Sequence, residues 1–295
     1  MSQPSGDTLR GLGFALAAYF LWGFLPLYMK MLSHVGAAEV VAHRIIWSVP
    51  VAGAVLLYMR RTGDIWTALR SPRVVSLACV TAVLIGFNWL TYVYAVATDR
   101  ALEAALGYYI NPLFSIFLSA VILGERLNRL QMVAIGFAIA AVAVLTAEVG
   151  ALPWISVTLA GTWGIYALSK RTLPIGPNQG FLLEAMLLSP AALIYVMVLG
   201  QQGVGFFATT SANTALLMGC GVVTAVPLII YAHAAKMVRL STIAVMQYIA
   251  PTMIFLVAVL VFKEEVTPAK VIAFPLIWAA LVIYSIALWR QRGAA

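Results

Sequence analysis

Two charged residues stand inside long apolar stretches of the sequence, Arg44 in the first half and Glu184 in the second. Such a residue is a candidate for function, because an apolar surrounding makes a charge costly. The two positions are equivalent when the second half is aligned on the first, and each precedes a proline by six residues. They could couple solute movement to a charge or a proton. The alternative is structural pairing near helix ends. Glu39 or Glu103 would then neutralise Arg44. Lys170 would neutralise Glu184.

Two histidines, His43 and His233, also lie in or beside apolar runs. An imidazole changes its charge near neutral pH, so either histidine could relay protons during transport. The alternative for both is a hydrogen-bonded histidine with a structural role only.

A set of aromatic and amide side chains occupies similar apolar surroundings. Tyr92 and Tyr109 in the first half recur as Tyr231 and Tyr248 in the second, at one constant spacing. Phenol, indole and amide groups suit a largely apolar solute with one polar end. The alternative for tryptophan is a place at the membrane interface. The candidate substrate-binding residues are Trp22, Asn88, Tyr92, Tyr108, Tyr109, Trp163, Tyr166, Tyr231, Gln247 and Tyr248.

Two prolines, Pro112 and Pro251, follow the repeated tyrosines and complete a Tyr-Ile-X-Pro pattern in each half. Proline removes a backbone donor and frees a carbonyl, which must be satisfied inside the protein in a membrane. We expect the two prolines to act as hinges beside a cavity. A kink that only improves packing is the alternative.

The sequence offers none of the motifs that typify an enzyme. We find no His or Cys cluster with metal-ligand spacing, no Gly-x-x-x-x-Gly-Lys-[Ser/Thr] loop and no nucleophile motif. We therefore expect no catalytic residue, no metal and no cofactor. Any energy would come from a gradient of solute or ion, since this chain has no means of hydrolysing a nucleotide.

The composition shows what must position these residues. Of 295 residues, 63% are hydrophobic and 9% are charged, whereas a soluble domain carries about a quarter charged residues. A membrane span needs about 20 apolar residues, so the chain has room for roughly ten spans. An uncharged stretch of 51 residues, 185–235, is too long for one helix and breaks near residues 200–213. The sequence therefore predicts an all-helical protein with ten transmembrane helices.

The basic residues give an orientation. With a cytoplasmic N-terminus, 13 of the 18 lysines and arginines fall on the cytoplasmic side. This is the positive-inside bias of membrane proteins. Both termini are then cytoplasmic. The net charge of +8 is explained by orientation and predicts no nucleic-acid partner.

The repeated residues predict a duplicated unit of five helices, 1–147 and 148–295. Because five is odd, the second copy enters the membrane from the opposite side. This inverted repeat is the architecture by which secondary transporters alternate access to a site near the midplane.

Seven segments, taken in order, resemble the RarD branch of the EamA family, in the drug/metabolite transporter superfamily. They are AAYFLWGFLPLYMK (17–30), HRIIWS (43–48), AVLIGFNWL (82–90), LEAALGYYINPL (102–113), LGERLNRLQ (123–131), TAVPL (224–228) and RLSTIAVMQYIAPT (239–252). The resemblance implies a bacterial inner-membrane protein of ten helices and two EamA repeats, with both ends cytoplasmic. It also implies a central cavity lined by helices 1, 3, 4, 6, 8 and 9, which carry the substrate-binding candidates.

Together these features predict a secondary exporter of small organic metabolites, with hydrophobic or aromatic amino acids as the favoured substrates. The expected partners are this solute and the lipid bilayer. Efflux of amphenicol-type drugs is one alternative. A membrane sensor or scaffold that transports nothing is the other, and the sequence leaves the oligomeric state open.

Overall fold

The computed structural model describes residues 7–58, 62–124 and 127–292, and these are helical with no strand. The helices of the first half are α1 (Leu9–Met31), α2 (Ala37–Tyr58), α3 (Gly63–Leu69), α4 (Pro72–Ala97), α5 (Ala101–Leu123) and α6 (Arg129–Val149). Those of the second half are α7 (Trp154–Thr172), α8 (Pro177–Gln201), α9 (Ser211–Ala234), α10 (Leu240–Met246), α11 (Ile249–Leu256), the π-helical turn η1 (Val257–Val261) and α12 (Pro268–Arg292). The predicted all-helical fold is confirmed for the described residues.

Eight of these helices are long and apolar enough to cross a membrane, and Ile249–Val261 forms a shorter apolar helix. The long uncharged stretch does divide into two helices, since α8 ends at Gln201 and α9 begins at Ser211. The two remaining expected spans are α7 and the segment α10–α11–η1. A total of ten spans therefore stays a prediction.

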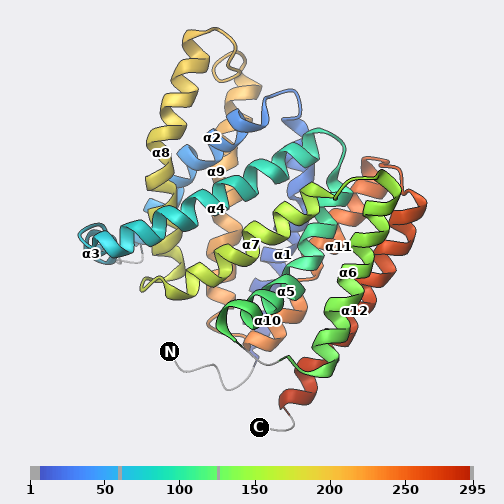
Figure 1. The fold of residues 1–295 in the computed structure, drawn as a ribbon. Coiled ribbons are helices and arrows are strands. Elements are labelled where there is room, and N and C mark those ends of the chain that lie inside the picture. The colour runs from blue at the N-terminus through green and yellow to red at the C-terminus, as the bar shows by residue number, and fades with distance from the viewer. Residues whose placement is uncertain (1–6, 59–61, 125–126, 293–295) are drawn as a thin grey trace.

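The helices of the two halves pack in matching pairs (Figure 1). Where α1 packs against α9 and α11, its counterpart α7 packs against α4 and α5. In the same way, α2 packs against α9, and its counterpart α8 packs against α4. Two helices also contact their own counterparts, α2 with α8 and α6 with α12. The matched contacts differ in extent, because α2 and α9 pack more extensively than α4 and α8.

Two glycines show this correspondence at the level of single residues. A Cβ atom at Gly23 would lie 2.4 Å from the Cβ of Met253. A Cβ atom at Gly164 would lie 2.7 Å from the Cδ1 of Phe114. Phe114 and Met253 are separated by the same spacing as the repeated tyrosines. Close approach of α1 to α11, and of α7 to α5, therefore depends on glycine at equivalent places.

The two halves differ at the repeated prolines. Helix α5 continues past Pro112, whereas the equivalent segment is interrupted between α10 and α11, just before Pro251. A proline ring clashes with the carbonyl four residues earlier, which here belongs to Gln247. Gln247 and Tyr248 are the residues at which the helix breaks. A π-helical turn follows α11, so this segment departs from regular geometry twice.

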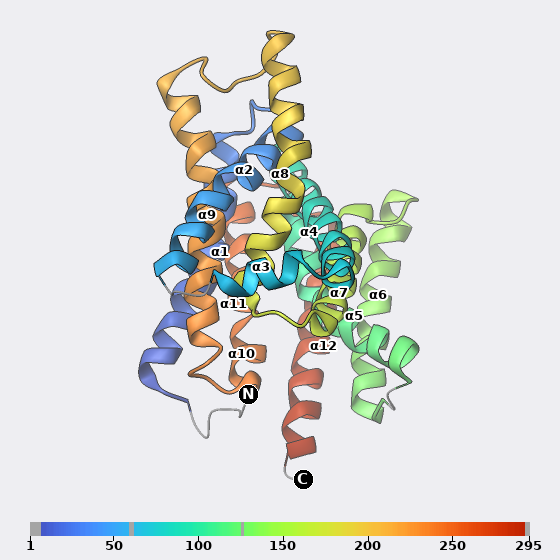
Figure 2. The ribbon, with the colours of Figure 1, turned by 90° about the vertical axis from the view of Figure 1, so that its left-hand side faces the viewer.

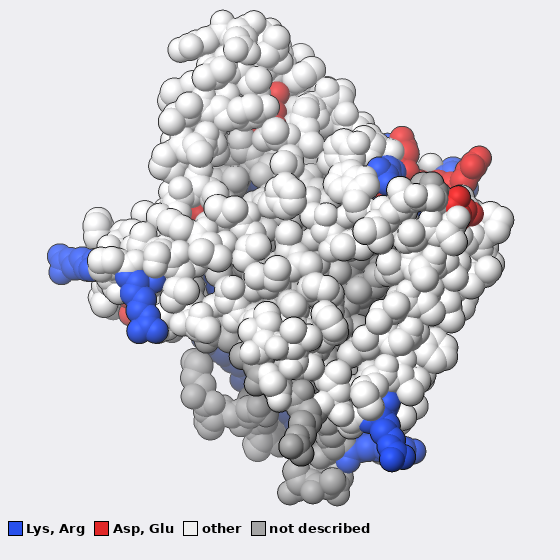
Figure 3. Space-filling view, in the orientation of Figure 1, with Lys and Arg blue, Asp and Glu red and all other residues white. Residues whose placement is uncertain are grey.

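Charged residues are rare in the middle of the visible surface. Helix α1 begins and α12 ends toward the same end of the bundle, and the loop between α8 and α9 lies at the other (Figure 2). In Figure 3 most of the visible lysines, arginines and carboxylates lie at the ends and edges of the face, and only small parts of a few show nearer the centre. This distribution suits a helical bundle that is surrounded by lipid.

Candidate functional site

Arg44 lies in the interior of the bundle with 3% of its surface exposed. Its Nε donates a hydrogen bond to the Oγ1 of Thr224 at 3.1 Å, which joins α2 to α9. Its guanidinium carbon lies 4.8 Å from the centre of the Trp89 ring on α4. The Nη1 atom is buried and has no hydrogen-bond partner. No carboxylate of the described residues forms an ion pair with this charge.

The expected pairing of Arg44 with Glu39 or Glu103 is wrong. Glu39 instead accepts backbone N–H bonds from Phe206 and Phe207 at 2.7 and 3.2 Å, which hold the loop between α8 and α9. Glu103 forms an ion pair with Arg100, three residues earlier in the chain. These carboxylates satisfy groups at the helix ends, and Arg44 is left without a counter-charge among the residues described.

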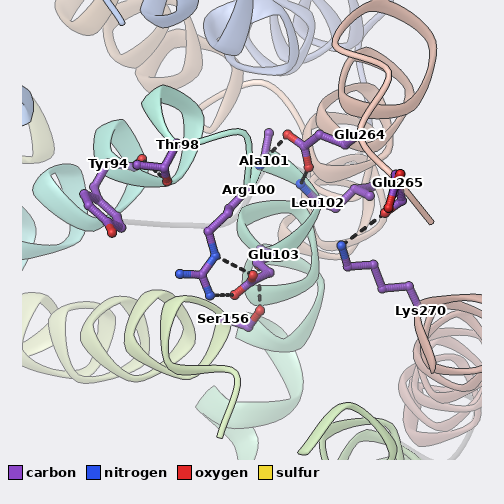
Figure 4. A network of polar contacts seen from close by, with 10 residues as sticks. All are labelled: Tyr94, Thr98, Arg100, Ala101, Leu102, Glu103, Ser156, Glu264, Glu265 and Lys270. Carbon is purple, nitrogen blue, oxygen red and sulfur yellow. Dashed lines mark hydrogen bonds and ion pairs between the residues drawn. The ribbon is translucent and has the colours of Figure 1, made fainter. Parts of the chain in front are cut away.

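Figure 4 shows the pairing that Glu103 makes. Arg100 donates from Nε and Nη2 to the two oxygens of Glu103 at 2.7 and 2.9 Å, and it lies over the Trp154 ring at 5.6 Å. Ser156 donates to the backbone carbonyl of Glu103. Arg100 thus resembles Arg44 in its tryptophan contact but differs in having a carboxylate.

A second carboxylate in Figure 4 belongs to Glu264, in the loop before α12. It accepts the backbone N–H groups of Ala101 and Leu102 at 2.7 and 2.9 Å, at the beginning of α5. Loss of hydration raises the pKa of the Glu264 carboxyl, and the two N–H groups act against that rise. This contact ties the second half of the chain to the first.

Three predicted substrate-binding residues gather beside Arg44. The rings of Tyr92 and Tyr108 lie 5.8 Å apart, and the buried hydroxyl of Tyr92 has no partner. Tyr108 donates to the Oδ1 of Asn88 at 3.5 Å, a long contact. The amide nitrogen of Asn88 in turn donates to Leu159 and Thr162 on α7. This group, with Arg44 and its contacts Trp89 and Thr224, is called the arginine cluster below.

A second group surrounds Glu184, whose side chain is 2% exposed. Lys170 on α7 forms an ion pair with one carboxylate oxygen, and the hydroxyl of Tyr166 donates to the other at 3.2 Å. Tyr166 also lies 5.6 Å from Trp163, ring to ring. The predicted Lys170–Glu184 pair is confirmed. These residues are called the glutamate cluster below.

A third aromatic group lies between α1 and α9. The centre of the Trp22 ring is 5.5 Å from that of Tyr231 and 5.6 Å from that of Tyr19. The rings of Tyr19 and Tyr231 are 5.9 Å apart, so the three rings form a triangle. Trp22 and Tyr231 occupy the places in the repeat that correspond to Trp163 and Tyr92. The structure thus brings these two predicted residues together.

Tyr109 and Tyr248 lie elsewhere, at a groove of about 580 Å³ bounded by α5, α11 and α12. Tyr109 and Thr252 share a hydrogen bond of 2.7 Å between their hydroxyls, and the Tyr248 hydroxyl is buried without a partner. Trp289 at the rim is 76% exposed. Gln247 lies next to Tyr248 at the end of α10. The structure therefore does not bring these tyrosines together with Tyr92 and Tyr108.

The two histidines occupy different surroundings. His43 is buried, with its Nδ1 3.2 Å from the indole nitrogen of Trp47 and its ring stacked 4.8 Å from Phe207. His233 is exposed near the end of α9, with its Nδ1 2.8 Å from the carbonyl of Ile229. These contacts fit the structural alternative for both, and a proton relay stays a prediction.

Two residues of the arginine cluster were missed by the sequence reasoning, Trp89 and Thr224. Trp89 follows the predicted Asn88 directly, and Thr224 begins one of the seven family-like segments. Thr224 donates to the carbonyl of Cys220, one turn earlier, while accepting from Arg44. Across residues 7–58, 62–124 and 127–292, no three His, Cys, Asp or Glu side chains gather to hold a metal ion.

A bundle of helices that are long and apolar enough to cross a membrane, with polar groups in its interior, defines the class of multi-pass membrane proteins. The profile of the EamA-like transporter family matches residues 9–147. The chain is 43% identical to "Protein RarD" of Streptomyces exfoliatus, over 95% of this chain and 90% of that one. It is 38% identical to "Protein RarD" of Escherichia coli strain K12, over 97% of each chain.

The chain belongs to the RarD branch of the EamA family and is a multi-pass protein of the inner membrane. It is also 37% identical to "Uncharacterized transporter YojE" of Bacillus subtilis strain 168, over 98% of each chain. A solved structure titled "Crystal structure of protein" matches with a TM-score of 0.61 at 18% identity, over 95% of this chain and 98% of that one. That similarity concerns the fold alone.

Proposed function

We propose that this protein is a secondary exporter of small organic metabolites, with hydrophobic and aromatic amino acids as its substrate class. It acts by alternating access. Ten helices form two inverted halves, 1–147 and 148–295, and both termini are cytoplasmic. The chain itself carries out no chemical reaction and uses no cofactor or nucleotide.

The observation that carries this proposal is the matched packing of the two halves. Equivalent helices make equivalent contacts, down to Gly23 against Met253 and Gly164 against Phe114. Two inverted halves around a shared centre can rock and expose that centre to either side of the membrane. The unequal extent of the α2–α9 and α4–α8 contacts is what a conformation closed on one side would have.

The substrate class rests on the side chains at the centre. The arginine and glutamate clusters contain four aromatic side chains, which come from α4, α5 and α7. They are Tyr92, Tyr108, Trp163 and Tyr166. Aromatic faces bind apolar groups, and the nearby hydroxyl and amide groups bind polar ones. In the rocking model Pro112 and Pro251 serve as hinges, and the interrupted helix before Pro251 supports that role.

The test is counterflow of radiolabelled phenylalanine and leucine into liposomes that contain the purified protein. We expect accumulation with the wild type and a loss of at least about tenfold with Trp163→Ala. Trp289→Ala, at the exposed rim of the α12 groove, is the matched control and should transport normally. Absence of flux for every amino acid would overturn the substrate class.

The same assay separates the rival functions. A relative in Pseudomonas aeruginosa, 27% identical over 93% of each chain, is named "Chloramphenicol-sensitive protein RarD". If chloramphenicol accumulated and amino acids did not, drug efflux would replace the proposal. If no solute were transported and none altered the thermal stability, a role as a sensor or scaffold would replace the proposal. A proton-coupled mechanism through Glu184, His43 or His233 requires that an imposed pH gradient drive accumulation.

A further inference from the structure

The charge of Arg44 faces only uncharged groups. Its titratable neighbours are Cys220 on α9, Tyr92 on α4 and Tyr108 on α5. Its contacts from the same helices are Thr224, which accepts its hydrogen bond, and the face of the Trp89 ring. None of these groups carries a negative charge at neutral pH. The guanidinium is thus buried in the bundle without a counter-ion among the described residues.

Four other cations among the described residues form ion pairs within the fold, and Lys170 does so in a mostly buried site. They form the pairs Lys30–Asp99, Arg100–Glu103, Lys170–Glu184 and Arg239–Asp7. A buried charge without a partner is strongly unfavourable, and in a membrane it typically marks a pathway for a substrate or an ion. The contrast indicates that the partner of Arg44 comes from outside the chain.

The free donors near Arg44 match one type of ligand. The Nη1 of Arg44 and the hydroxyl of Tyr92 are both buried and both without a partner. The Tyr108 hydroxyl beside them has only the 3.5 Å contact to Asn88. A guanidinium binds a planar carboxylate through parallel hydrogen bonds, and phenol hydroxyls add further donors. The aromatic rings around the cluster suit an apolar group attached to that carboxylate.

We propose that Arg44 and Tyr92 bind the carboxylate of the transported molecule, so that the protein selects carboxylic acids, including zwitterionic amino acids. This assignment rests on the proposed export function and names the group that the site recognises. Binding brings the missing negative charge to Arg44. A solute that lacks a carboxylate leaves the guanidinium unpaired and is excluded.

In this proposal the solute reaches Arg44 by separation of α4 from α8. The Trp89 ring contacts the guanidinium and also lies 6.3 Å from the Phe181 ring on α8. This interface is the less extensive member of its matched pair, whereas α2 and α9 are closely packed around Gly221. A Cβ atom at Gly221 would lie 2.3 Å from the backbone of Trp47. Separation of α4 from α8 therefore opens the cluster at less cost than separation of α2 from α9.

The experiment compares three phenyl compounds with the purified protein in nanodiscs at low salt. They are 3-phenylpropionate, which has only the carboxylate, L-phenylalanine, which is zwitterionic, and 2-phenylethylamine, which has only the amine. The readout is the rise of the melting temperature with ligand concentration, which gives an apparent Kd. We expect the two carboxylates to raise the melting temperature of the wild type and the amine to leave it unchanged.

Arg44→Gln should weaken binding of both carboxylates by at least about tenfold, the usual effect of losing a charged hydrogen bond. Arg100→Gln is the matched control, because it also removes an arginine from the face of a tryptophan. Its guanidinium is already paired with Glu103, so carboxylate binding should be unchanged. If Arg44→Gln does not fold, Arg44→Lys replaces it, and the loss of the planar fork should again weaken binding.

Three results would overturn this assignment. They are no effect of carboxylates on the wild type, equal effects on wild type and Arg44→Gln, or equal effects of L-phenylalanine and 2-phenylethylamine on the wild type. Chloride is titrated separately, and a shift by chloride that carboxylates do not compete would point to an inorganic anion instead. 3-Phenylpropionate is not an amino acid. If it bound in an Arg44-dependent way but no amino acid were transported, the export proposal would be wrong and the carboxylate site would stand. If Arg44→Gln still transported amino acids, the carboxylate site would be wrong and the export proposal would stand.

Discussion

The arginine cluster and the glutamate cluster occupy equivalent places in the two halves and treat their charges differently. Arg44 and Glu184 align in the repeat and lie on the corresponding helices α2 and α8. Glu184 has Lys170 and Tyr166 as partners, one on each oxygen. Arg44 has Thr224 and the face of Trp89, and one of its terminal nitrogens has no partner.

The difference indicates different roles for the two charges themselves, Glu184 and Arg44. A neutralised pair joins α7 to α8 and needs nothing further, so it belongs to the framework of the bundle. An arginine without a counter-ion destabilises the protein until a ligand supplies one. Of these two aligned charges, Glu184 is paired within the chain, and Arg44 is left without a counter-ion among the described residues. Stability and binding should respond in opposite ways when the two clusters are altered.

The largest effect is expected from breaking the glutamate cluster. Glu184→Gln leaves Lys170 without its carboxylate in a mostly buried site, where its side chain is 21% exposed. We expect a loss of about 3 kcal/mol of stability, at the low end for a broken buried pair because Lys170 keeps some exposure. The measurement is thermal unfolding in nanodiscs. Lys170→Met combined with Glu184→Leu removes both charges and should recover most of the loss, and a single variant as stable as wild type would contradict this role.

The opposite result is expected at the arginine cluster. Arg44→Gln removes a buried charge that no described residue neutralises, so the ligand-free protein should gain about 1 kcal/mol of stability. The gain is limited because the contacts with Thr224 and Trp89 are lost as well. The melting temperature without ligand should rise, while transport falls. A melting temperature well below that of the wild type would mean that Arg44 is a structural residue.

The helical fold followed closely from the sequence, because apolar length and basic loops act locally. The break in the 51-residue stretch lies where Gly200–Asn213 predicted it, between α8 and α9. The short helix α3 was not predicted, since it has only seven residues and lies between two long apolar runs. The interruption before Pro251 was not distinguished from the continuous helix at Pro112, because the same Tyr-Ile-X-Pro pattern occurs in both.

The candidate site was predicted only in part. Sequence spacing and membrane side identified Lys170 as the partner of Glu184, but the same reasoning gave Arg44 the wrong partners. Glu39 is used by backbone N–H groups of a loop 167 residues away, which a pattern in one dimension does not reveal. Tyr109 and Tyr248 were grouped with Tyr92 by repetition alone. Neighbouring positions on a helix point to different faces, and so repetition does not tell which face meets the cavity.

A smaller effect compares two phenol hydroxyls. Tyr166→Phe removes a hydrogen bond to Glu184, which Lys170 still neutralises, so we expect a loss of about 0.6 kcal/mol, the average for such bonds in membrane bundles. Tyr92→Phe removes a buried hydroxyl that has no partner, and stability should stay the same or rise. Thermal unfolding of the two variants, prepared together, decides between these directions. Equal losses would mean that the unpartnered hydroxyl of Tyr92 contributes as much to stability as the hydrogen-bonded hydroxyl of Tyr166.

The smallest effect concerns an ion pair at the surface, which serves as a reference for the buried one. Arg239 and Thr242 donate hydrogen bonds to Asp7, and they hold the pKa of this carboxyl below its usual value of 3.8. A carboxyl whose pKa is lower in the folded state stabilises the protein above its unfolded pKa, and this contribution is lost as the pH falls. We therefore expect the melting temperature of the wild type to fall more than that of Asp7→Asn as the pH is lowered below about 4. The difference should shrink in high salt, because surface pairs are screened. The Lys170–Glu184 pair should show no such salt dependence, because it is mostly buried. If salt screened both pairs equally, Glu184 would be open to water. The two clusters would then differ less than their burial indicates.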